Sequence, residues 1–328
     1  MLRKKYTNID NIENNKKFSD VWKWRREAKN LQKDLTDLIP QAADKQIAFM
    51  QNNTVQPTIT WVGHATFLIQ LGGVNILTDP VWALKMGFRP RITQPGLTIK
   101  ELPEINIVLI SHGHYDHLDF PTLRQLKGEP TYLVPVGFKN LFLRKGLKNV
   151  EELTWWDNRT FDQLQFTFVP AQHWTRRGLF DLNTSHWGGW VIKNADQQVC
   201  IYFVGDSGYF SGFQEIGKKF SIDYLLMPIG AYEPEWFMSE SHINPDDAVK
   251  AYLELEAENF IPMHYGTYDL SDDTGSKALE RLIKAWNEKR LDSSKLLILQ
   301  LGETIHLSDD NNNGPNRHDY ARGNIDED

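Results

Sequence analysis

Three histidines and one aspartate fall within six residues of one another in the segment SHGHYDHLD, residues 111–119. They directly follow the apolar run 105–110, which predicts a β-strand. A strand that runs into a turn can point its side chains into one cleft, so imidazole and carboxylate groups can surround neighbouring metal positions. These are ligands that borderline ions such as zinc accept. A chance polar surface patch is the alternative to a metal site built on His112, His114, Asp116 and His117.

The segment matches the pattern H-x-H-x-D-H and therefore resembles the signature of the metallo-β-lactamase superfamily. The resemblance implies an α/β fold, a four-layer αββα sandwich, in which three further ligands come from distant strand ends. Candidates follow apolar runs in the expected order, at His173, Asp206 and His264. Each of these residues alone could be a structural residue that hydrogen-bonds backbone. It is the ordered set that favours metal binding.

The resemblance also implies how two metals would be shared. One would be held by His112, His114 and His173, and the second by Asp116, His117 and His264, with Asp206 as the bridge. Two Zn²⁺ per chain are expected, with other divalent metals as alternatives, because the di-iron flavoproteins of the superfamily have Glu where this chain has His114. The two cations would lower the pKa of a shared water to about 7 and supply hydroxide at neutral pH. His64, in the stretch WVGHAT, matches a family pattern too and is expected to support the site rather than to bind metal.

Residues 58–307 further resemble the phospholipase D that hydrolyses N-acyl-phosphatidylethanolamine. The shared sequence segments include residues that metal binding does not require, such as LTDP at 77–80 and PIGAYEP at 228–234. The resemblance implies a binuclear phosphodiesterase that hydrolyses a lipid or small-molecule phosphodiester directly by the metal-bridged hydroxide. Asp206 and His242 are the expected catalytic residues, and His242 and Tyr115 the expected substrate contacts. A hydrogen-bonded surface role for His242, and packing of Tyr115 beneath the metal loop, are the alternatives.

Other functions remain open on the sequence. The same ligand pattern suits a lactonase that acts on a sugar phosphate, and a metal-stabilised lipid-binding module without turnover would need the same ligands. A nuclease is a weaker alternative, because 36 basic and 43 acidic residues give a net charge of −7, which repels polyanions. Nucleic acid is therefore not an expected partner.

Runs of β-forming residues recur from residue 58 onward and outnumber the helical patterns. The predicted strands are 58–62, 66–71, 74–78, 105–110, 131–136, 165–169, 187–192, 199–204, 224–229, 260–263 and 296–301. Helical patterns cover 246–255 and 277–289. This pattern predicts two packed sheets with helices on their outer faces, in a catalytic domain that spans 57–308.

Residues 1–56 form a predicted N-terminal extension with an amphipathic helix. Its apolar positions have helical spacing, at Val21, Trp24, Ala28, Leu31, Leu35 and Leu38. The opposite face is basic, so the helix either lies on an anionic membrane or docks on the body of the protein. The polar tail 309–328 is expected to be disordered.

The single cysteine, Cys200, excludes an internal disulfide and fits a reducing compartment. The first residues lack the apolar stretch of a secretory signal, and every apolar run is shorter than the roughly 20 residues that cross a bilayer. We therefore expect a cytoplasmic protein that can contact the inner face of a membrane peripherally. A homodimer remains open.

Overall fold

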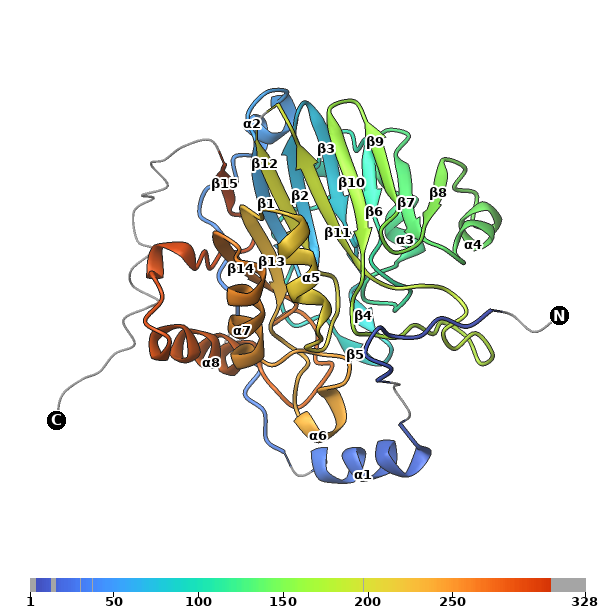
Figure 1. The fold of residues 1–328 in the computed structure, drawn as a ribbon, viewed down its shortest axis with the longest axis vertical. Helices are drawn as coiled ribbons and strands as arrows, with labels where there is room; N and C mark the ends of the chain where they lie inside the picture. Colours follow the sequence, from blue (N-terminus) through green and yellow to red (C-terminus); the bar gives the residue numbers. More distant parts are fainter. Residues whose placement is uncertain (1–3, 13–15, 30, 37, 197, 308–328) are drawn as a thin grey trace.

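Two β-sheets lie face to face with helices on their outer sides (Figure 1). The computed structural model describes residues 4–12, 16–29, 31–36, 38–196 and 198–307. The core between the sheets is apolar, and the same cluster continues into the helices on the second sheet. The four-layer α/β arrangement expected from the sequence is confirmed.

The first sheet has seven strands in the order β15-β1-β2-β3-β6-β7-β8. These strands are β1 (Thr58–Gly63), β2 (Thr66–Leu71), β3 (Val74–Thr78), β6 (Ile107–Leu109), β7 (Thr131–Pro135), β8 (Val150–Leu153) and β15 (Thr304–His306). Strands β3, β6, β7 and β8 are parallel, so their carboxyl ends meet at one edge of the sheet. Asp79, after β3, and the segment 111–119, after β6, therefore emerge side by side.

The second sheet has six strands in the order β14-β13-β12-β11-β10-β9. These strands are β9 (Asn158–Phe161), β10 (Leu164–Val169), β11 (Gly189–Asn194), β12 (Val199–Phe203), β13 (Tyr224–Pro228) and β14 (Asn259–Met263). β12, β13 and β14 are parallel, and β10 runs in the same direction because both β10 and β12 are antiparallel to β11. The segments that carry His173, Asp206 and His264 therefore leave this sheet at one end. A separate hairpin pairs β4 (Lys85–Met86) with β5 (Arg89–Pro90).

Helices pack on both outer faces. The helices on these faces are α2 (Ile47–Asn52), α3 (Phe120–Leu123), α4 (Lys139–Arg144), α5 (Gly212–Lys219), α7 (Pro245–Leu255) and α8 (Gly275–Glu288). Two others, α1 (Phe18–Ala28) and α6 (Glu235–Met238), lie at one end of the molecule. Buried residues of α2, α3 and α4 cluster against the first sheet, and those of α5, α7 and α8 against the second. Helix α7 begins where Asn244 accepts a hydrogen bond from the backbone N–H of Asp247 and Pro245 fills the first helical position.

Some predictions from the sequence are wrong. The run 296–301 is not a strand, because only isolated bridges join it to its neighbours: Leu296 pairs with Phe260 of β14, and Leu301 pairs with Gln41 in an irregular segment. The edge strand that pairs with β1 is instead β15, which was not predicted. Strands β8 and β9 were not predicted either. None of the helices in the described ranges is long and apolar enough to cross a membrane. The predicted disordered tail, 309–328, lies outside the described residues.

The N-terminal helix is shorter than its apolar spacing predicts, because α1 ends at Ala28. Every residue of α1 remains at least partly exposed. Its main contact with the body is Trp24, whose ring stacks on Phe237 of α6 with a centroid distance of 5.1 Å. Phe18 and Trp22 remain 87% and 59% exposed, so the helix touches the body through one side only.

Candidate metal centre

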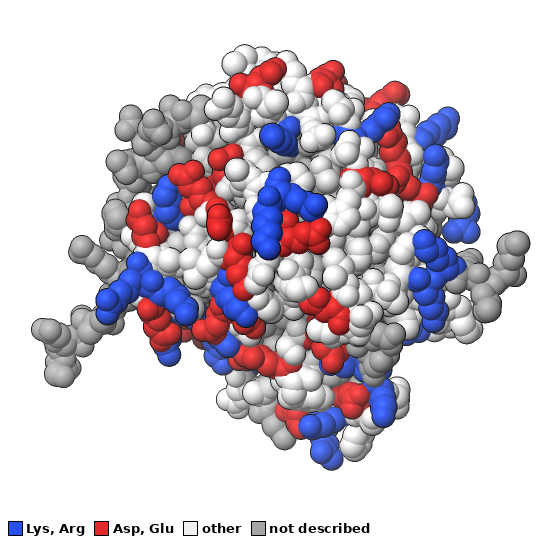
Figure 2. Space-filling view, viewed as in Figure 1, with Lys and Arg blue, Asp and Glu red and all other residues white. Residues whose placement is uncertain are grey.

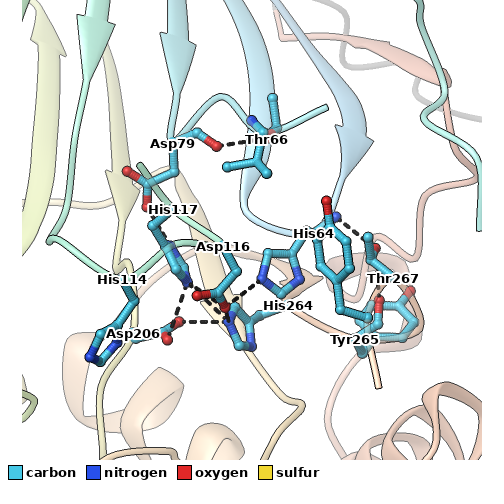
Figure 3. A network of polar contacts seen from close by, with 12 residues as sticks. His64, Thr66, Asp79, His114, Asp116, His117, Asp206, His264, Tyr265 and Thr267 are labelled. Atoms are coloured by element: carbon cyan, nitrogen blue, oxygen red, sulfur yellow. Dashed lines mark hydrogen bonds and ion pairs between the residues drawn. The ribbon is translucent and has the colours of Figure 1, made fainter. Parts of the chain in front are cut away.

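The predicted ligands meet in the seam between the two sheets, at the ends of strands from both. His112, His114, Asp116 and His117 follow β6 of the first sheet, whereas His173, Asp206 and His264 follow β10, β12 and β14 of the second. The structure brings all seven residues together. Figure 3 shows Asp206 beside His117 and His264, with Asp116 and His64 facing the same space.

One donor set consists of three imidazoles whose ring nitrogens converge. Nδ1 of His114 lies 2.9 Å from Nε2 of His112 and 3.1 Å from Nε2 of His173. Two nitrogens bound to one tetrahedral zinc at about 2.0–2.1 Å are about 3.3–3.4 Å apart. The observed spacing is within a few tenths of an ångström of that value, so these rings fit a shared cation.

The second donor set combines two imidazoles and a carboxylate. Nε2 of His117 lies 3.1 Å from Nε2 of His264, and Oδ2 of Asp116 lies 3.4 Å and 3.5 Å from these two nitrogens. Imidazole nitrogens that face each other bring lone pairs together, an arrangement that a cation between them would satisfy. This set also has the donor chemistry of a divalent metal site.

Asp206 lies between the two sets and is 3% exposed. Its Oδ2 is 3.9 Å from Nε2 of His112 and 3.8 Å from Nε2 of His173, in the first set. The same oxygen is 3.2 Å from Nε2 of His117, and Oδ1 is 3.0 Å from Nε2 of His264. A single carboxylate therefore faces both donor sets.

Hydrogen bonds fix which ring nitrogen three of these histidines present to the site. Nδ1 of His117 donates to Oδ2 of Asp79 at 2.7 Å, and Nδ1 of His173 donates to the backbone oxygen of Ser241 at 2.9 Å. Ser111 Oγ donates to Asp79, so this hydroxyl accepts from Nδ1 of His112 at 2.9 Å. In His112, His117 and His173 the nitrogen directed into the site is consequently Nε2, and the hydrogen bond on Nδ1 holds the ring in that orientation, as in metal-binding histidines.

Asp79 is the functional residue that sequence reasoning missed. It is fully buried, and it accepts hydrogen bonds from His117 and from both the backbone N–H and the hydroxyl of Ser111. Burial raises the pKa of its carboxyl, and these hydrogen bonds partly oppose the shift. Its position directly after a strand parallel to β6 was the available signal, but an Asp before a Pro also suits an ordinary turn.

Burial decides the charge of the first donor set. It lowers the pKa of His112 and His173 well below 6.5 and that of His114 to about 4. These rings are therefore neutral at neutral pH, which is the form that binds metal.

Pairing with carboxylates decides the protonation of the second donor set. Burial acts to lower the pKa of His117 and His264, but Asp206 and Asp116 outweigh it: the pKa of His117 lies well above its usual value and that of His264 rises to about 9. Burial acts to raise the pKa of both carboxyls, and the histidines hold them well below their usual range. Positive charge is thus favoured between these groups, whether protons or cations provide it.

His64 and His242 both lie at the centre. His64 belongs to the group of Asp116, His117 and His264, and its Nε2 donates to Oδ2 of Asp116 at 3.1 Å, which favours the supporting role expected from the sequence. Nδ1 of His242 lies 3.8 Å from Oδ2 of Asp206, and the side chain is 16% exposed. The alternative of a surface position for His242 is therefore wrong.

Arg177 holds the loop that carries the ligands. Its guanidinium donates to the backbone oxygens of Gly113 and Leu118 at 2.7 and 2.9 Å. Tyr115 lies outside the loop rather than beneath it: the side chain is 57% exposed, and its hydroxyl donates to the backbone oxygen of Arg177 at 2.8 Å. Tyr115 is therefore at the rim, where a substrate could reach it.

Comparisons with known proteins agree with this geometry. The model of the Beta-lactamase superfamily domain matches residues 74–265. An N-acyl-phosphatidylethanolamine-hydrolyzing phospholipase D of Caenorhabditis elegans is 38% identical over 230 residues, which are 64% of this chain and 64% of that protein. The chain thus spans less than two thirds of the length of that relative.

Two further relatives broaden the picture. A metal-dependent hydrolase of Methanopyrus kandleri is 30% identical over 214 residues, 64% of this chain and 84% of that protein. The solved structure of Igni18, a metallo hydrolase from Ignicoccus hospitalis, has a TM-score of 0.58 at 20% identity and covers 77% of this chain and 98% of that chain, a likeness in fold. The chain therefore belongs to the metallo-β-lactamase superfamily.

Proposed function

We propose that the protein is a zinc-dependent phosphodiesterase that performs phospholipase D-type hydrolysis of N-acyl-phosphatidylethanolamine-like lipids. The position of Asp206 between the two donor sets is the observation that carries the chemistry, because one carboxylate shared by two cations is the arrangement of binuclear hydrolases. The 38% identity to the nematode phospholipase D supports the substrate class. The preponderance of imidazole donors supports zinc.

When bound, a pair of zinc ions would lower the pKa of a water and neutralise charge on phosphate oxygens. The side chains of this chain fix where that chemistry happens. Asp206 lies between the two donor sets, and Asp79 and Ser111 hold the imidazoles of His117 and His112 in one orientation. Nδ1 of His242 lies 3.8 Å from Oδ2 of Asp206. The backbone N–H of His242 donates to the backbone oxygen of Met238 at 2.9 Å.

His242 has the properties of a hydrogen-bond donor to the substrate. Burial lowers its pKa, so the ring is neutral at pH 7 and holds one N–H. Among the described residues, its buried Nδ1 has no hydrogen-bond partner, although it lies beside Asp206. A neutral imidazole in this position can donate a hydrogen bond to a phosphate oxygen of the substrate and stabilise the charge that develops there.

A lipid surface is the partner that the exterior supports. Exposed apolar side chains occur on three segments near the strand ends that carry the site: Phe18 and Trp22 on α1, Leu84 and Phe88 around the β4–β5 hairpin, and Leu179 and Phe180. Figure 1 shows α1, α6 and this hairpin at one end of the molecule. On the face in Figure 2, basic and acidic side chains are interspersed, which does not favour a polyanion such as nucleic acid.

The experiment is metal analysis and an activity screen on one preparation of the whole chain. We expect two zinc equivalents per chain and release of phosphatidic acid from N-acyl-phosphatidylethanolamine in mixed micelles. The Asp206→Asn variant should lose turnover, whereas a pure lipid-binding module would keep its ligand. Asp162→Asn is the matched control, because Asp162 is exposed in the β9–β10 turn.

Two results would overturn the proposal. Efficient opening of lactones with poor cleavage of both N-acylated phospholipids and bis-p-nitrophenyl phosphate would indicate a lactonase. Fewer than one metal per chain, in protein never exposed to chelator, would remove the basis of the chemistry.

A further inference from the structure

The N-terminal segment 4–12 reaches the metal centre, although it precedes the part of the chain that the family model matches, 74–265. Asn8 is the point of contact and is only 7% exposed. The backbone N–H of His173 donates to Oδ1 of Asn8 at 3.1 Å, and Nδ2 of Asn8 donates to the backbone oxygen of His173 at 3.0 Å. One side-chain amide thus pairs with both backbone groups of a predicted ligand.

The remaining capacity of the Asn8 amide is also used. Its oxygen accepts from Nε1 of Trp187 at 2.9 Å, and its nitrogen donates to the backbone oxygen of Ile12 at 2.8 Å. An amide with two donors and an oxygen that accepts twice is therefore fully satisfied. Such a saturated pattern fixes the orientation of the group, because any rotation breaks several bonds together.

The segment is anchored on both sides of Asn8. The ring of Tyr6 stacks on His186 with a centroid distance of 4.3 Å, and the backbone N–H of Tyr6 donates to Asn183 at 2.9 Å. Beyond Asn8, the carboxylate of Asp10 accepts from the backbone N–H of Ser211 at 2.9 Å. Asn8 is consequently held against the body at two points independent of His173.

We propose that Asn8 is a positioning residue of the metal centre, which acts through the backbone of His173. His173 lies beyond the end of β10, where no sheet partner holds its main chain in the described residues. Ser241 fixes one nitrogen of its ring and Asn8 fixes its backbone, so that Nε2 points at Nδ1 of His114. The proposal rests on the metal centre and not on the identity of the substrate.

The test compares Asn8→Ala with Thr7→Ala, since Thr7 is a neighbouring exposed residue, whereas Asn8 is the one that bonds His173 and Trp187. Metal-free full-length protein is titrated with Co²⁺ against a chromophoric chelator, and the visible absorption of the bound Co²⁺ is recorded. Groups that orient metal ligands contribute 10–100-fold to affinity, so we expect about a 10-fold weaker dissociation constant for Asn8→Ala and an altered Co²⁺ spectrum. Thr7→Ala should match the parent protein in both.

A second variant keeps the proposal falsifiable if Asn8→Ala does not fold. Asn8→Asp retains the oxygen that accepts from His173 and Trp187 but replaces the donor to His173 with a second acceptor, so weaker binding and an altered spectrum are again expected. Unchanged affinity and spectrum in whichever variant folds would overturn the proposal, even if the melting temperature falls, because that result indicates a contribution to folding alone. These readouts do not involve lipid hydrolysis, so they stand apart from the fate of the phospholipase assignment.

Discussion

Replacing Asp79 with asparagine exchanges the buried carboxyl group beside the metal centre for an amide of the same shape. Asparagine also tolerates the backbone angle at this position, where φ is +30°. The carboxylate accepts from Nδ1 of His117 and from two donors of Ser111. An amide has a single acceptor oxygen, so its NH₂ group must face a donor of His117 or Ser111.

The size of the effect follows from these contacts. A buried donor that loses its acceptor costs about 1–3 kcal/mol. Loss of a carboxylate that orients a metal-binding imidazole costs about 10–100-fold in affinity or activity, equivalent to about 1.4–2.7 kcal/mol. The two ranges overlap, and we therefore expect zinc affinity to fall by about 10–100-fold.

The assay is zinc titration of metal-free protein in competition with a chromophoric chelator. Asp162→Asn serves as control, since Asp162 is exposed and also has a positive φ, of 51°. A change of less than about threefold in Asp79→Asn, with the variant folded, would refute the view that Asp79 orients His117 for metal binding.

Four further outcomes are expected. Arg177→Ala should lower the free energy of unfolding by about 1.5–3 kcal/mol, measured by urea denaturation, because bonds from a charged group to the ligand loop are lost; an unchanged midpoint would contradict this. Metal-free protein should lose stability as pH rises through about 9, the pKa of His264, because His264 and His117 bind protons more tightly when folded than unfolded; a melting temperature that is flat or rising from pH 7 to 10 would argue against this pairing. His242→Gln should reduce kcat by about 100-fold at unchanged zinc content, because a hydrogen-bond donor to the developing charge is lost or misplaced, and equal activity would rule out this role for the ring. Trp22→Ser should weaken sedimentation with anionic vesicles without changing the melting temperature, and undiminished binding would exclude α1 from the lipid surface.

The strands that flank the site could be predicted because their patterns are local. β2 and β3 occupy the predicted ranges, since both are short, mostly apolar runs of β-forming residues separated by Gly72 and Gly73, which have positive φ. The run 296–301 is equally apolar and Leu301 is fully buried, yet it forms no strand. Burial dictates the composition of a run, but pairing depends on which backbone lies beside it, and that neighbour is distant in sequence.

The predicted ligands carried a signal because histidines and aspartates at short spacing after a strand are rare. No comparable signal in the sequence pointed to Asp79 or Asn8. Asp79 precedes a proline, as in an ordinary turn, and Asn8 is a single asparagine in a polar segment. Their roles arise only when the chain brings them to His117 and His173, 38 and 165 residues away. The helical spacing that continued to Leu38 misled for the same reason, because Leu35 and Leu38 line hollows of the body beside Tyr265 instead of extending α1.

The ligands come from the ends of strands in both sheets, so a cation at this seam would also act as a clasp between the two halves of the sandwich. Its binding energy would then add to the cohesion of the molecule, and thermal resistance should rise with the logarithm of free metal concentration. Removal of the metal by a chelator should promote local unfolding at the strand ends that carry the ligands. Amide hydrogen exchange should therefore become faster in the ligand loops, whereas the exchange rates at the opposite ends of the strands should stay the same. Metal supply would thereby govern how long the folded chain survives as well as whether it turns over substrate.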